Sequence, residues 1–134
     1  MMDKFRKMVC VDFDGVLHSY SSGWQGADLI PDKPVPGAMG WLKKLVQETP
    51  YDVGIFSARA TQDRGAEAIK DWLYKELLKV CFSDDEAIEI ADSIKILHHK
   101  PPEGFIFIDD RAFHFEGKFP SLSYLETFTP WGKK

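Results

Sequence analysis

The sequence predicts one α/β domain in which a parallel sheet lies between two layers of helices. Its 134 residues suit a single domain, 1–134, and no repeat or linker divides them. Short apolar runs alternate with segments of helical periodicity, an order that is typical of parallel sheets. The runs are continuously apolar rather than alternating, so we expect each strand to be buried on both faces. Together these features predict a three-layer α/β/α architecture.

Three apolar runs predict the buried strands. Residues 8–13 (MVCVDF) are rich in valine and include an acid near their end. Residues 51–56 (YDVGIF) form the second run. Residues 105–108 (FIFI) form the clearest one, with turn-forming residues before it and two acids after it. Residues 94–97 add a short candidate for a fourth strand.

Helical patterns occupy the intervals between these runs. A loop-like segment rich in Ser, Gly and Pro spans 18–36, and apolar residues at helical spacing follow until Pro50. The longest helical pattern covers 61–80. A Ser with Glu three positions later predicts a capping box that begins a short acidic helix over 83–92. Residues 121–128 predict one or two further helical turns.

Composition excludes several functional classes. The net charge of −4 argues against non-specific coating of nucleic acid, which requires many Lys and Arg contacts with phosphates. No apolar run reaches ~18 residues, so we expect no spanning helix and no membrane partner. The N-terminal apolar run is interrupted by acids and does not resemble a secretory signal. We expect Cys10 and Cys81 to be reduced and buried in a cytoplasmic protein.

Charged and hydroxyl side chains follow the predicted strands, at the edge of a parallel sheet where ligands bind. Asp12 and Asp14 stand two positions apart at the first strand end, so both point to the same side. The residues after the other strands are Ser57, Arg59, Lys100, Asp109 and Asp110. Four carboxylates close together must take up protons or bind a cation. Oxygen ligands without clustered His or Cys indicate Mg²⁺.

This set of residues suits phosphoryl transfer. Asp12 could attack phosphorus as a nucleophile and form an aspartyl-phosphate. Asp14 could protonate the leaving oxygen and then act as the base for the water that cleaves the acyl phosphate. Ser57, Arg59 and Lys100 could bind the phosphate oxygens, with Arg59 able to make two parallel hydrogen bonds. Positioning and charge neutralisation would be the main contributions of the protein.

Four segments resemble, in order, the motifs of the haloacid dehalogenase-like (HAD) phosphatase superfamily. VDFDGVLH (11–18) resembles the first motif and FSAR (56–59) the second. Lys100, within HKPP, matches the third-motif lysine, and IDDR (108–111) resembles the acidic fourth motif. The set also resembles small hydrolase-like proteins of phages and bacteria. The SxR and DDR details resemble the 3′-phosphatase domain of polynucleotide kinase.

The resemblance implies a Rossmann-like HAD fold and an Asp12 phosphoenzyme that uses Mg²⁺. The implied metal ligands are Asp12, Asp109, Asp110 and Asp14, the last through its carbonyl oxygen. Lys100 precedes the acid pair more closely than in many superfamily members, so Lys95 remains a competitor for the third-motif lysine. Arg111 is expected to be structural. His18, four residues past the second acid of the first motif, could approach the site.

The intervals between the motifs leave no room for the cap domain that many superfamily members carry. They span 15–56 and 60–99, which the predicted loop and helices already fill. A capless site is open, which suggests a macromolecular substrate, a homo-oligomer that supplies the lid, or poor selection among substrates. The candidate phosphorylated substrates are a nucleotide, a small sugar phosphate and a 3′-phosphorylated nucleic-acid end.

The main alternative is a module that binds phosphate or Mg²⁺ without turnover. A receiver-like signalling domain also uses carboxylates, a hydroxyl and a lysine at strand ends. Its phosphate-accepting Asp would stand on a middle strand, where this chain has Ser57. A degenerate fold that binds a partner is the third interpretation. The presence of all four motifs in order favours the enzyme.

Overall fold

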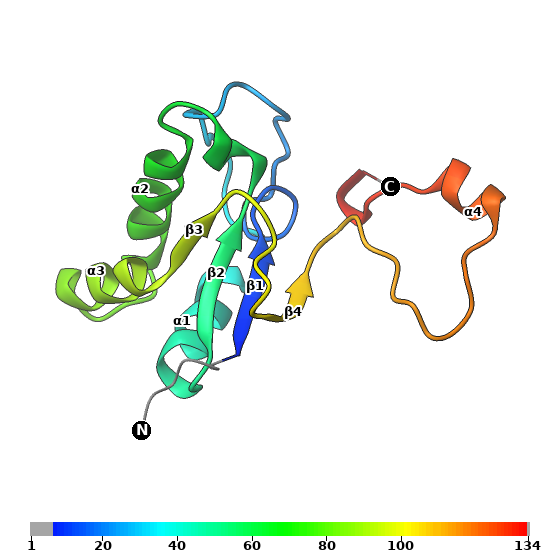
Figure 1. Ribbon diagram of the computed structural model, residues 1–134. Helices are drawn as coiled ribbons and strands as arrows, with labels where there is room; N and C mark the ends of the chain where they lie inside the picture. Colours follow the sequence, from blue (N-terminus) through cyan, green and yellow to red (C-terminus); the bar gives the residue numbers. More distant parts are fainter. Residues whose placement is uncertain (1–6, 134) are drawn as a thin grey trace.

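The computed structural model describes residues 7–133, which form a sheet of four parallel strands with helices packed against it (Figure 1). The strands are β1 (Met8–Asp12), β2 (Asp52–Phe56), β3 (Lys95–Leu97) and β4 (Gly104–Ile108). Their order across the sheet is β3-β2-β1-β4, and every neighbouring pair is parallel. The predicted α/β class with a parallel sheet is therefore confirmed.

The predicted helices are present, with bounds that differ by one to a few residues. They are α1 (Ala38–Glu48), α2 (Gly65–Leu77), α3 (Asp84–Ser93) and α4 (Leu122–Thr127), with short 3-10 turns η1 (Ala58–Thr61) and η2 (Trp131–Lys133). The pattern over 61–80 is shortened at both ends, because Thr61 belongs to η1 and α2 extends only from Gly65 to Leu77. Ser83 caps α3 by accepting the Glu86 N–H at 3.1 Å. The Glu86 carboxylate accepts the Phe82 N–H at 2.7 Å, one residue earlier than a reciprocal capping box requires.

The hydrophobic core lies between one face of the sheet and three helices. Helices α1, α2 and α3 contact one another behind the sheet as drawn in Figure 1. The strand side chains in this core are Val9, Val11, Val53 and Ile55, which alternate along β1 and β2 as the pleat requires. The helix side chains that meet them include Leu42, Ile69, Leu73, Leu77 and Ile90. Burial of this face holds β1 in the middle of the sheet.

The other face of the sheet differs from the prediction. Figure 1 shows no described helix over it; the connection between β3 and β4, residues 98–103, crosses it instead. On this face the ammonium of Lys100 lies 5.4 Å from the ring centre of Phe56 and 5.2 Å from that of Phe107. The second helical layer is therefore not confirmed. The connection is too short to form the helix that would supply it.

Strand β4 is exposed, although its sequence predicts a buried strand. Phe105 is 50% exposed, Ile106 49% and Phe107 36%. The strand lies at the edge of the sheet and pairs only with β1. The expectation of burial on both faces was wrong for this strand, because the described residues supply no layer to cover it.

The structure also bears on the expectations for the two cysteines and for a membrane-spanning helix. Both cysteines are free thiols; Cys10 is buried as expected, and Cys81 is only partly buried. Within residues 7–133, every helix is too short or too polar to cross a membrane.

The two isoleucines of α3 provide a matched test of the core. Ile90 is 2% exposed, whereas Ile88 is 44% exposed. We expect Ile90→Ala to lower the free energy of unfolding by about 2–5 kcal/mol, because it leaves a cavity. Ile88→Ala should change it by less than about 0.5 kcal/mol. Urea unfolding followed by circular dichroism measures both, and equal losses would contradict this arrangement of α3.

Candidate functional site

The site is built on the turn that follows β1. The N–H groups of Leu17 and His18 both donate to the carbonyl of Phe13, which makes the turn tight. Gly15 has a φ of 88°, and a Cβ there would lie 2.5 Å from a carboxylate oxygen of Asp110. Only glycine fits this backbone and this close approach. The Asp-x-Asp-Gly sequence therefore brings the end of β1 against the end of β4.

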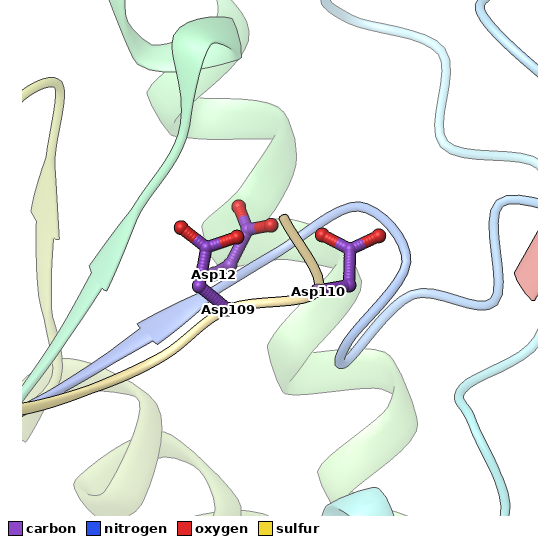
Figure 2. A group of neighbouring side chains, drawn as sticks. All are labelled: Asp12, Asp109 and Asp110. Atoms are coloured by element: carbon purple, nitrogen blue, oxygen red, sulfur yellow. The ribbon is translucent and has the colours of Figure 1, made fainter. Parts of the chain in front are cut away.

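Three carboxylates gather at these strand ends, as Figure 2 shows. Asp12, Asp109 and Asp110 each offer one oxygen, and these oxygens all lie within 4.8 Å of one another. Burial raises the pKa of Asp12 to about 8, assisted by the neighbouring carboxyls of Asp110 and Asp109. The Oδ1 atom of Asp110 is buried without a hydrogen-bond partner. A divalent cation that prefers oxygen ligands fits this set, because it would neutralise the repulsion and supply the missing partner.

Asp14 stands apart from this cluster, because its carboxylate is held from the other side. The Nε of Arg59 donates to Asp14 Oδ2 at 2.8 Å and Nη2 donates to Oδ1 at 3.1 Å. His18 Nδ1 lies 2.8 Å from Oδ1. Burial alone would raise the pKa of Asp14, but the hydrogen bonds from His18 and Arg59 outweigh it and the pKa is lowered. The Asp14 side chain is therefore held as a carboxylate.

Arg59 occupies a different place from the predicted phosphate ligand. Its side chain is completely buried. The Nη1 atom donates to three carbonyl oxygens of one loop, those of Gly26, Ala27 and Leu29, at 2.8, 3.1 and 3.1 Å. The Trp24 ring lies 4.8 Å from the guanidinium carbon. With these partners Arg59 fixes Asp14 and the loop, and it does not line the pocket described below.

His18 has a defined tautomer. The Asp32 N–H donates to His18 Nε2 at 3.1 Å, so Nε2 carries the lone pair and the ring proton lies on Nδ1, facing Asp14. The ring is fully buried and packs against the aromatic rings of Phe13 and Trp72. His18 therefore reaches the site through Asp14 and orients this carboxylate.

A pocket of about 260 Å³ lies at the carboxyl end of β1. The residues predicted for the site that line it are Asp12, Asp14, Ser57 and Asp110. Its other lining residues are Gly15, Ser19, Tyr20, Ala58, Arg111, Pro130 and Gly132. The C-terminal segment forms one wall, and Trp131 Nε1 donates to the Gly15 carbonyl at 2.9 Å. The structure thus brings together residues that are more than a hundred positions apart.

Ser57 lines the pocket, whereas Lys100 lies beside the acid cluster and is not one of the lining residues. Ser57 is buried at the end of β2, and its hydroxyl accepts the Arg59 N–H at 3.1 Å. Lys100 Nζ lies 3.6 Å from Asp109 Oδ2, and its side chain is 52% exposed. Lys95 is the exposed first residue of β3, and it pairs with Gly54, two residues before the end of β2. It therefore lies farther from the strand ends that carry the acids. The geometry therefore favours Lys100 as the cation beside the cluster.

Arg111 and the C-terminal wall are among the contributors to the pocket that the sequence-based prediction lacks. Arg111 was expected to be structural, but it is exposed, lines the pocket and donates its N–H to Asp109 Oδ1 at 2.9 Å. Its place directly after the acid pair was a usable signal. The sequence contains no comparable signal for the C-terminal wall, because Pro130, Trp131 and Gly132 do not match a catalytic or ligand-binding motif.

Comparison with known proteins gives no relative for this chain. No protein-family model matches it, and neither a curated protein nor a solved structure matches it. The interpretation of the site therefore depends on its own residues and their geometry.

Arg59→Met should destabilise the protein strongly. It removes the guanidinium from a largely buried carboxylate, and it removes a donor from three loop carbonyls. We expect a loss of about 3 kcal/mol, the low end for a broken buried pair, because Asp14 keeps some solvent contact. Arg111→Met, at an exposed arginine, should change stability by less than about 0.5 kcal/mol. Urea unfolding measures both variants; equal effects would contradict the buried pair.

Mg²⁺ should stabilise the folded protein by binding the three carboxylates. At a concentration 100 times its Kd the gain is about 2.7 kcal/mol, seen as a higher Tm. The gain should shrink as the pH falls, because protons compete for the same oxygens. Asp110→Asn should reduce it, whereas Asp63→Asn, at an exposed acid outside the cluster, should leave it unchanged. An equal gain in both variants would contradict this metal site.

Proposed function

We propose that this protein is a Mg²⁺-dependent phosphomonoester hydrolase that acts through an aspartyl-phosphate on Asp12. The observation that carries the proposal is the cluster of three carboxylates with a buried, unpartnered oxygen on Asp110. It adjoins a pocket that also contains the hydroxyl of Ser57 and the side chain of Arg111. In this proposal the chain is a small, capless member of the HAD superfamily, in agreement with its four motifs.

The reaction takes two displacements at phosphorus. In the first, an Asp12 carboxylate oxygen forms a bond to phosphorus, the bond to the leaving oxygen breaks, and this oxygen takes up a proton from solvent. In the second, water attacks the phosphorus of the acyl phosphate, gives a proton to Asp14 and releases Asp12 with inorganic phosphate. Asp12, Asp109 and Asp110 would hold Mg²⁺, which neutralises charge on the phosphoryl oxygens when bound.

The surroundings of Asp14 favour one half of its expected role. Two donors hold it as a carboxylate, the state that accepts a proton from the attacking water. Protonation of the leaving oxygen requires the opposite state, which the same hydrogen bonds disfavour. Asp14 therefore starts in the protonation state that the base step requires, and the acid step would first require its protonation.

The phosphate ligands are also revised by the geometry. Ser57 and Arg111 line the pocket and supply a hydroxyl and an exposed guanidinium. Lys100 is the cation next to Asp109 and would balance the charge of the carboxylates. Arg59 becomes a positioning residue, since all the contacts described for its guanidinium lie within the protein.

The pocket suits a phosphoryl group better than a whole substrate. Its volume of about 260 Å³ falls below the roughly 300–1,000 Å³ typical of small-molecule sites. Most of the leaving group would therefore remain outside, which agrees with a nucleotide, a sugar phosphate or a nucleic-acid end. The ratio of kcat/KM for a 3′-phosphorylated oligonucleotide to that for free nucleotides would separate a nucleic-acid end from a free nucleotide.

Asp12→Asn should abolish turnover while the fold is retained. We expect release of phosphate from para-nitrophenyl phosphate to fall by about 10³-fold or more, because the nucleophile is removed. A chelator should have the same effect on the wild type, and Asp63→Asn should retain full activity. Substantial turnover by the Asp12 variant would contradict the mechanism. A wild type without turnover that captures beryllofluoride on Asp12 would instead indicate a binding module.

Arg111→Met should weaken phosphate binding without altering the fold. Loss of a hydrogen bond to a charged group removes about 1.5–3 kcal/mol. The expected fall in kcat/KM is about 10- to 150-fold, mostly through KM. Arg111→Lys should recover part of the loss, because it restores the charge without the planar guanidinium. An unchanged KM in the Met variant would remove Arg111 from the phosphate site.

A further inference from the structure

The strongest unexplained feature is apolar surface that the protein leaves uncovered near its C-terminal end. Of the large apolar side chains that are exposed in residues 7–133, eleven lie between 105 and 131. Three are on β4: Phe105, Ile106 and Phe107. Eight are on the segment after it, residues 112–131, here called the C-terminal arm: Phe113, Phe115, Phe119, Leu122, Tyr124, Leu125, Phe128 and Trp131.

Strand β4 is exposed on both of its faces. Phe105 and Phe107 point to one face and Ile106 to the other, and all three are a third exposed or more. Strands of a parallel sheet are normally covered on both faces. An apolar strand at an open sheet edge is also a ready surface for another chain. The sheet therefore lacks one covering element at β4.

The C-terminal arm has many apolar side chains but no core of its own in which to bury them. Helix α4 is six residues long and has no buried residue. A helix this short is not stable without packing against a larger surface. The arm is fixed at both ends, by β4 before it and by the hydrogen bond from Trp131 to Gly15 after it. Between these points it projects away from the sheet (Figure 1).

We propose that a second copy of this chain covers both surfaces. The arm of each copy packs over β4 of the other, so that one twofold axis buries both surfaces twice. Eleven side chains that are about half exposed offer roughly 1,000 Å² per copy, at roughly 100 Å² each. One partner in a standard interface contributes about 800 Å². The uncovered area is therefore sufficient for a stable dimer.

The charges on the arm favour a second copy over other occupants. The formally charged residues between 112 and 131 are Glu116, Lys118 and Glu126. One lysine among two acids provides no basic patch for nucleic acid or for anionic lipid. The arm is also close to neutral, so two copies would repel each other little. The apolar arm of one copy is therefore complementary to the apolar β4 surface of another copy.

Substitutions in the arm test this dimer. Wild-type protein should have about twice the 15.3 kDa chain mass by sedimentation or light scattering. The double variant Phe119→Ser, Leu122→Ser should be monomeric, because these side chains are 86% and 76% exposed and contribute most to the uncovered surface. Phe82→Ser is the matched control: Phe82 is 94% exposed but lies between α2 and α3, so this variant should stay dimeric.

A second measurement needs no variant. Amide hydrogen exchange in 104–108 and 113–128 should slow as the protein concentration rises, whereas exchange in α3 should not change. A wild type that is monomeric at all concentrations would overturn the proposal, and so would one that binds vesicles or another protein through the arm only as a monomer. A dimer that the arm substitutions leave intact would overturn it too. Mass and exchange do not depend on turnover, so these results are independent of the proposed phosphatase activity.

Discussion

The buried contact between Arg59 and Asp14 is the interaction on which the site depends. A buried guanidinium is costly unless its donors are satisfied, and here they are divided between one carboxylate and three carbonyl oxygens. These partners belong to the turn after β1 and to residues 26–29 of a long loop without helix or strand, while Arg59 itself lies in η1 after β2. One side chain thus joins three segments that are far apart in the sequence.

A second chain of contacts reinforces the same loop. His18 donates to Asp14 and accepts the N–H of Asp32, and the carbonyl of Asp32 accepts the indole N–H of Trp72 on α2 at 3.1 Å. The loop is therefore attached to the core helices as well as to the turn. Because both networks end on Asp14, the two acids of the first motif have different surroundings. Asp14 is compensated by donors, whereas Asp12 faces two further carboxylates.

This difference decides the chemistry that the two acids can perform. Neighbouring carboxyl groups whose pKa values are shifted in opposite directions are suited to different roles in one reaction. The pKa of Asp14 is lowered by its donors, and that of Asp12 is raised by burial and by its acidic neighbours. The sequence predicted that both acids matter, because the Asp-x-Asp-Gly pattern follows a buried strand. It could not predict their difference, which arises from residues 45 and four positions away.

The structure differs from the expectations for β4 and for Arg59 for one physical reason. The strands, the helices and the strand-end acids could be predicted because each depends on local pattern: apolar runs, helical spacing and the end of a strand. Burial of β4 and the position of Arg59 depend on tertiary contacts with segments that are distant in the sequence. A local sequence pattern does not contain this information. The FIFI run nevertheless carries information, since four consecutive large apolar residues are characteristic of a strand covered on both sides. The described chain leaves side chains on both faces of β4 a third exposed or more. The C-terminal arm that could cover them also forms a wall of the pocket through Pro130, next to Gly132. A partner that packs on the arm would therefore hold one wall of the pocket in place, so the same contact would complete the sheet and the site.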